Sequence, residues 1–73
     1  MRGVVYIERE NTAGDRRIIR TIDLEGLPAG TDQMAFVRQA ARDALEAPDA
    51  CVVRAMHDQG WATEIVAVER LRP

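Results

Sequence analysis

The sequence contains neither lysine nor serine, and its 73 residues include one cysteine and one histidine. Without lysine the chain can form neither a Schiff base nor a P-loop, and without serine it has no serine-based catalytic triad. A single cysteine, Cys51, cannot make an internal disulfide, and a single histidine, His57, cannot supply a conventional zinc site. We therefore expect a protein that is not an enzyme and that holds no metal or other cofactor.

The sequence also lacks a long hydrophobic run and a strong net charge. Its first apolar run, about five residues long, is shorter than the core of a signal peptide, and no run approaches the roughly 20 residues that span a bilayer. We therefore expect a cytoplasmic location. The net charge of −2 disfavours tight binding to a phosphate backbone. All ten basic residues are arginine, which favours GC-rich coding and a bacterial or phage source.

The length of the chain indicates one domain, residues 1–73. A domain of this size buries only about 60% of its extended-chain surface, so its own core contributes little stability. Small domains usually add disulfides, a metal or a second chain. Because the first two are excluded, the sequence favours association with a protein partner or with a second copy.

Turn-forming residues divide the chain into two hairpins around one helix. We predict the first hairpin at residues 3–24, the helix at residues 32–47 and the second hairpin at residues 51–69. This order predicts an α+β fold, ββαββ, with a four-stranded sheet and one helix packed on one face. The order resembles the β-grasp arrangement, in which a right-handed crossover sets the first and fourth strands side by side and parallel at the sheet centre.

The helix has the clearest pattern. Thr31 or Asp32 is expected to cap its first turn. Apolar residues at helical spacing form one stripe, and charged or amide side chains occupy the opposite face. The stripe consists of Met34, Val37, Ala41, Ala44 and Leu45, and the polar face of Arg38, Gln39, Arg42, Asp43 and Glu46.

The turn at residues 58–60, Asp-Gln-Gly, fits a three-residue hairpin loop with glycine in the left-handed conformation. This loop predicts that Arg54 faces Glu64, together with three apolar pairs. These pairs are Val53 with Ile65, Val52 with Val66, and Met56 with Ala62.

The register of the first hairpin is less determined. We favour the register that pairs Glu8 with Arg17 and Ile7 with Ile18. A shift by one residue would set Arg9 opposite Arg17, and like charges in that position are unfavourable.

One helix can cover only one face of this sheet. We expect Cys51, Val53, Ala55, Ile65 and Ala67 to lie beneath it, while the other face keeps apolar side chains around an ion pair. That face is the predicted partner or dimer interface. The leading hypothesis is a small non-enzymatic protein-interaction module, a dimeric regulator or inhibitor. The predicted interface consists of Val52, Arg54, Met56, Glu64, Val66 and Val68.

The alternative is a nucleic-acid-associated regulator. Arg16, Arg17 and Arg20 on the second strand are candidate nucleic-acid contacts, although charge on an edge strand also serves to block aggregation. The stretch from Val4 to Glu46, with "VVYIERE", "DLEGLPAG" and "RQAARDALEA", is similar to small HicB-like antitoxin domains. The resemblance implies an antitoxin or DNA-associated regulator.

We expect structural roles for the remaining side chains that could carry chemistry. Cys51 and His57 lie roughly 20 Å apart along one strand, too far for a catalytic pair. We expect Cys51 in the core and His57 at the surface beside a turn. Glu8 and Glu10 alternate with an arginine, which is typical of a solvated strand edge.

Overall fold

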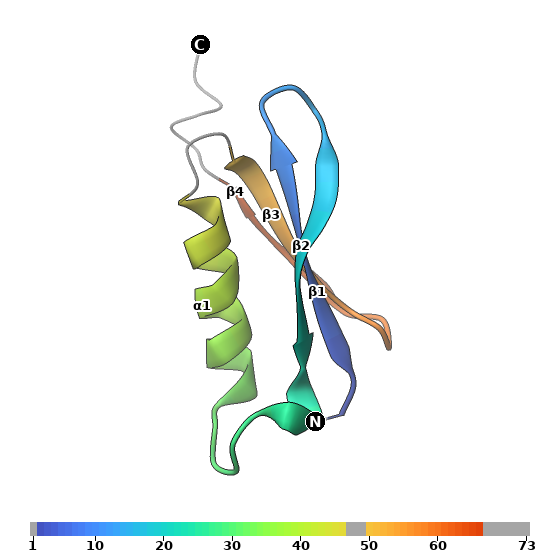
Figure 1. Cartoon of the computed structure of the whole chain (residues 1–73), viewed down its shortest axis with the longest axis vertical. Coiled ribbons are helices and arrows are strands. Elements are labelled where there is room, and N and C mark those ends of the chain that lie inside the picture. The colour runs from blue at the N-terminus through green and yellow to red at the C-terminus, as the bar shows by residue number, and fades with distance from the viewer. Residues whose placement is uncertain (1, 47–49, 67–73) are drawn as a thin grey trace.

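Four strands and one α-helix follow each other in the predicted order (Figure 1). The structure, a computed structural model, describes residues 2–46 and 50–66. The α+β class, with a four-stranded sheet and one helix on one face, is confirmed. The elements are β1 (Val4–Asn11), β2 (Arg16–Asp23), the short 3-10 helix η1 (Leu24–Gly26), α1 (Gln33–Leu45), β3 (Ala50–His57) and β4 (Ala62–Val66).

The strands form one antiparallel sheet in the order β2-β1-β3-β4. The expectation of parallel first and fourth strands at the sheet centre is therefore wrong, because β1 pairs with β3 and β4 lies at an edge. The apolar content of β3 explains this order. Five of its eight residues are buried, whereas Ala62 to Glu64 of β4 are exposed. Placing β3 beside β1 gives the central position to the strand with more apolar surface to bury.

The core lies between α1 and the face of the sheet that it covers. Val5 and Ile7 of β1 and Val53 of β3 are fully buried beneath the helix. On the helix, Ala40 and Ala41 are buried as well, and their small side chains allow a close approach to the sheet. Ile22, Leu24, Val37, Ala50, Cys51 and Ala55 are also buried, so the core position expected for Cys51 is confirmed.

Asp32, one of the two predicted residues, caps the helix. Its carboxylate accepts a hydrogen bond from the backbone N–H of Ala35 at 3.1 Å. The Gln33 side chain donates to the carbonyl of Leu24 at 3.0 Å, which ties the first turn of α1 to η1. The helix ends at Leu45, and residue 47 of the predicted span lies outside the described residues.

The register of the second hairpin is confirmed. His57 N–H donates to the carbonyl of Trp61 at 2.8 Å, and Gly60 takes a φ of +118° within the three-residue turn. All the predicted pairs occur, from Val52 opposite Val66 to Met56 opposite Ala62. The predicted strand residues 67–69 lie outside the described part of the chain.

The favoured register of the first hairpin is wrong. Asn11 N–H donates to the carbonyl of Asp15 at 3.0 Å, and Gly14 takes a φ of +85°, which closes the same kind of three-residue turn. This turn sets Arg9 opposite Arg17, the pair that charge repulsion seemed to exclude. The backbone geometry of the turn therefore outweighs one like-charge contact at an exposed end of the sheet.

A β-bulge interrupts the same hairpin. Ile7 pairs with Arg20 while the next residue, Glu8, pairs with Ile18, so Ile19 is an extra residue on β2. The bulge reverses the side to which later residues of β2 point. As a result, Arg17 and Arg20 lie on the same side of the sheet although they are three residues apart.

His57 is buried, contrary to the surface position expected for it. Its side chain is 3% exposed and stacks on Trp61 with a ring separation of 5.1 Å. One ring nitrogen, Nδ1, accepts from the N–H of Gln59 at 3.0 Å, and Nε2 lies 2.9 Å from the carbonyl of Arg2. Because Nδ1 accepts, Nε2 carries the proton and donates to that carbonyl. The histidine thus joins the start of the chain to the β3–β4 turn.

Candidate functional site

The face of the sheet opposite α1 is open, because no element of the described residues lies against it (Figure 1). Paired residues on neighbouring strands point to the same side, so the register assigns side chains to this open face. We define the open face by Tyr6, Glu8 and Glu10 of β1 and Val52, Arg54 and Met56 of β3, flanked by Arg16 and Ile18 of β2 and by Ala62 and Glu64 of β4.

The structure brings four of the six predicted interface residues together on the open face. They are Val52, Arg54, Met56 and Glu64. The backbone of Val66 pairs with Val52 as predicted, and Val68 lies outside the described residues. The grouping of these four residues agrees with the sequence analysis, and their role in binding stays a prediction.

Charged groups occupy the middle of the open face. Arg54 donates from Nε to a carboxylate oxygen of Glu64 at 3.0 Å, and its Nη2 contacts the same oxygen. On its other side Arg54 lies opposite Glu8 of β1. The hydrogen bond to Glu64 and the charge of that carboxylate raise the pKa of Arg54 above its usual value, and Glu8 and Glu10 act in the same direction. Arg54 therefore lies among three carboxylates that favour its cationic form.

Apolar side chains flank this charged centre. Tyr6 and Met56 are paired neighbours on the two central strands, and both are half-buried. Val52 lies beyond the ion pair on β3 and is also half-buried. On the β2 side Ile18 is 55% exposed. The open face thus combines exposed apolar area with a charged centre.

Sequence reasoning missed the contribution of β1 to the open face. Tyr6, Glu8 and Glu10 alternate with Val5 and Ile7, which are buried, and this alternation was a usable signal. The signal was lost because Glu8 and Glu10 were assigned to an edge strand. In the structure β1 is central, so these carboxylates lie within the sheet surface and not at its margin.

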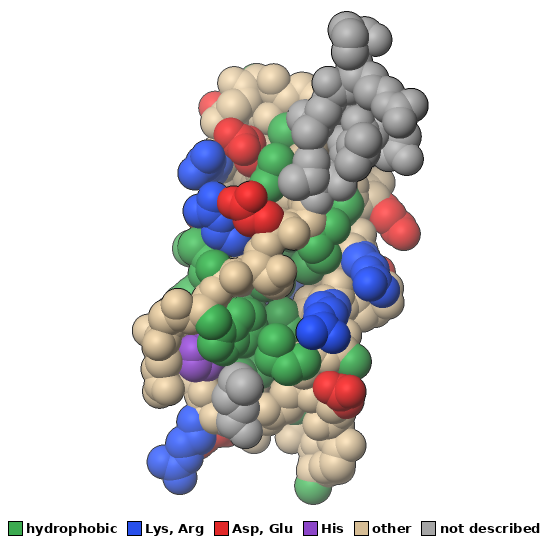
Figure 2. Space-filling view, turned by 180° about the vertical axis from the view of Figure 1, so that it is seen from behind, with side chains coloured by type: hydrophobic (Ala, Val, Ile, Leu, Met, Phe, Trp, Pro, Cys, Tyr) green, Lys and Arg blue, Asp and Glu red, His purple; other side chains and the backbone are tan. Residues whose placement is uncertain are grey.

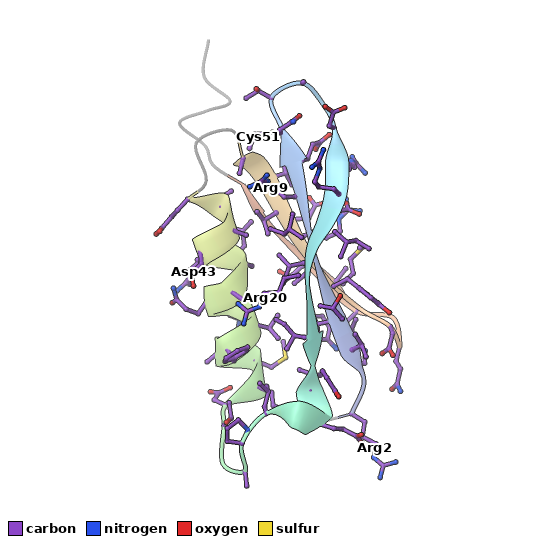
Figure 3. The ribbon with its side chains drawn as sticks, viewed as in Figure 1. Arg2, Arg9, Arg20, Asp43 and Cys51 are labelled. Carbon is purple, nitrogen blue, oxygen red and sulfur yellow. The ribbon has the colours of Figure 1, made fainter. Side chains whose placement is uncertain are left out.

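The arginines of β2 do not share one face. Arg16 points to the open face, where it lies 3.4 Å from the carboxylate of Glu10. Arg17 and Arg20 point to the other side, and the guanidinium of Arg20 lies 5.5 Å from the centre of the Phe36 ring on α1 (Figure 3). The candidate nucleic-acid contacts are thereby divided between two sides of the sheet.

Two hollows among the described residues are small. One, of about 10 Å³, lies on the open face among Glu8, Arg16 and Arg54. The other, of about 120 Å³, lies on the helix side between Arg9 and Arg17. Binding pockets for small molecules usually enclose roughly 300 Å³ or more. Among the described residues no group of histidine, cysteine and acidic side chains is arranged to hold a metal ion.

Hydrophobic side chains also reach the surface between α1 and β4. Figure 2 shows them gathered beside His57, with basic and acidic side chains on either side. Trp61 and Ile65 are among the partly buried residues that pack against the core. They complete the core along the β4 side of the helix, so this area belongs to the folding of the domain.

No helix in residues 2–46 and 50–66 is both long and apolar enough to cross a membrane.

In comparisons with known proteins, no protein-family model matches the chain, and it matches neither a curated protein nor a solved structure. The resemblance to HicB-like antitoxin domains therefore stays a prediction.

Proposed function

We propose that this protein is a small cytoplasmic protein-interaction module that forms a homodimer through the open face and acts as a regulator or inhibitor of a protein partner. One observation carries the proposal. The central strands β1 and β3 are fully buried at Ile7 and Val53 on the helix side, yet they present Tyr6, Val52 and Met56 half-exposed on the other side. Apolar area on an uncovered face of a sheet favours an interface.

The charges of the open face favour a second copy as the occupant. The face carries three carboxylates and two guanidinium groups, so it offers both signs within one surface. In a two-fold dimer the same surface meets itself, and each arginine of one copy can lie against a carboxylate of the other.

The composition of the core gives a physical reason for the chain to form a dimer. The largest fully buried side chains are Ile7, Leu24, Val5, Val37 and Val53, with no aromatic residue among them. A core of this kind gives a small domain little reserve of stability. Pairing the open faces would remove further apolar surface from water and stabilise both copies.

Two further features support the proposed non-enzymatic role and a bacterial or phage source. The hollows of about 10 and 120 Å³ are smaller than ordinary substrate pockets. The exclusive use of arginine supports a bacterial or phage protein.

Sedimentation equilibrium tests the dimer directly. We expect the unmodified chain to sediment with the mass of two copies at micromolar concentration and Met56→Lys with the mass of one, because a lysine would be desolvated within the interface. Ala35→Lys is the matched control, since residue 35 is exposed on α1, and it should leave the dimer intact. A folded Met56→Lys variant with unchanged mass, or a monomeric unmodified chain, would overturn the proposal.

A further inference from the structure

The β2 strand forms a second surface, separate from the centre of the open face. β2 is an edge strand, and seven of its eight residues are exposed, Ile22 being the exception. Ile18 is 55% and Ile19 37% exposed, and these are the large exposed hydrophobic residues of the described chain. A long edge with exposed isoleucines invites a further strand, because its outer backbone N–H and C=O groups have no strand neighbour among the described residues.

The charge of this edge from Arg16 to Ile22 has one sign. Arg16, Arg17 and Arg20 are exposed, and no acidic residue lies on β2 before Asp23. Because of the bulge, Arg17 and Arg20 point to the helix side, while Arg16 and Ile18 point to the open face. The edge therefore presents two guanidinium groups on one side and a guanidinium beside an apolar side chain on the other.

We propose that the β2 edge binds an extended acidic segment of another protein, which adds to the sheet as a fifth strand. Backbone hydrogen bonds along the edge would hold the segment, as in other cases of strand addition. Carboxylates on its helix side would lie near Arg17 and Arg20, where charged hydrogen bonds are strong. Apolar side chains on its other side would cover Ile18.

The charge of β2 favours an acidic segment over a second copy as the occupant of this edge. β2 carries three arginines and one acidic residue, Asp23, so two copies paired edge to edge would bring together surfaces of the same net sign. A nucleic acid would satisfy the guanidinium groups, but it would leave the backbone groups of the edge and the two isoleucines without partners. An acidic strand satisfies all three features.

Fluorescence anisotropy with a labelled eight-residue peptide of alternating glutamate and valine tests the proposal, the peptide matching the length of β2. We expect the peptide to bind and the double variant Arg17→Glu, Arg20→Glu to weaken the binding roughly tenfold or more. The matched control, Arg38→Glu with Arg42→Glu, makes the same charge change on the exposed face of α1 and should leave affinity within about twofold. Both double variants are checked for folding by circular dichroism.

A second peptide separates strand addition from simple charge attraction. Alternating glutamate and proline carries the same charge but has fewer backbone donors and cannot form a regular strand, so we expect it to bind roughly tenfold more weakly. Equal affinity for both peptides, no binding of the valine peptide, or tighter binding of single- or double-stranded DNA would overturn the proposal. The monomeric variant Met56→Lys should still bind the valine peptide, so this test fails or succeeds independently of the dimer.

Discussion

The two faces of the central strands carry different chemistry although neighbouring residues of the same strands supply both. On β1, Val5 and Ile7 point to the helix and are fully buried, whereas Tyr6 between them points to the open face and stays half-exposed. On β3, Val53 and Val52 show the same contrast. Antiparallel sheets commonly bury one face and expose a polar one. Here the exposed face keeps apolar residues on either side of its charged centre, and this departure is the basis of the proposed interface.

The largest predicted difference between the faces concerns folding stability. Ile7→Ala should lower the free energy of unfolding by about 2–5 kcal/mol, because it leaves a cavity in a closed core. Tyr6→Ala should cost about 1 kcal/mol in dilute protein, where the open face contacts only water. Urea denaturation followed by circular dichroism measures both values. Equal costs at the two positions would mean that the faces do not differ in packing.

The smallest predicted effect belongs to the ion pair between β2 and β1 on the open face. Arg16 lies 3.4 Å from Glu10, and its side chain is 54% exposed, so water screens the pair. Glu10→Gln should change the free energy of unfolding by less than about 1 kcal/mol. Thermal denaturation at low and high salt checks this value. A cost above about 2 kcal/mol would show that the pair is packed and that the charged part of the face is not open.

The sequence predicted the parts of the fold that local chemistry determines. The cap at Asp32, the polar face of the helix and the register set by Gly60 all follow from short-range backbone rules. The same rule holds at Gly14 in the structure, but the prediction for the first hairpin relied instead on avoiding the like-charge pair of Arg9 and Arg17. The turn should have been given more weight, because an exposed pair of charges costs little in water whereas turn geometry fixes every pair of the ladder.

Short-range sequence patterns could not predict the strand order or the bulge. The predicted strand order and the observed order both keep each hairpin intact. The choice between them depends on whether β3 or β4 buries more apolar area beside β1. The extra residue Ile19 leaves no mark in the pattern of the sequence, yet it decides on which side Arg20 lies. Because the pairing of β1 with β3 was not predicted, the sequence identified the β3 half of the candidate interface and missed Tyr6 of β1.

Methyl-detected NMR during dilution tests the central claim, that the open face is the surface through which two copies meet. We predict that the signals of Val52 and Met56 change with protein concentration while those of Ile7 and Val53 stay constant, because only the former residues would exchange a partner for water. The midpoint of the change should agree with the sedimentation data. Open-face signals that do not respond from micromolar to millimolar concentration, or core signals that respond equally, would contradict the account.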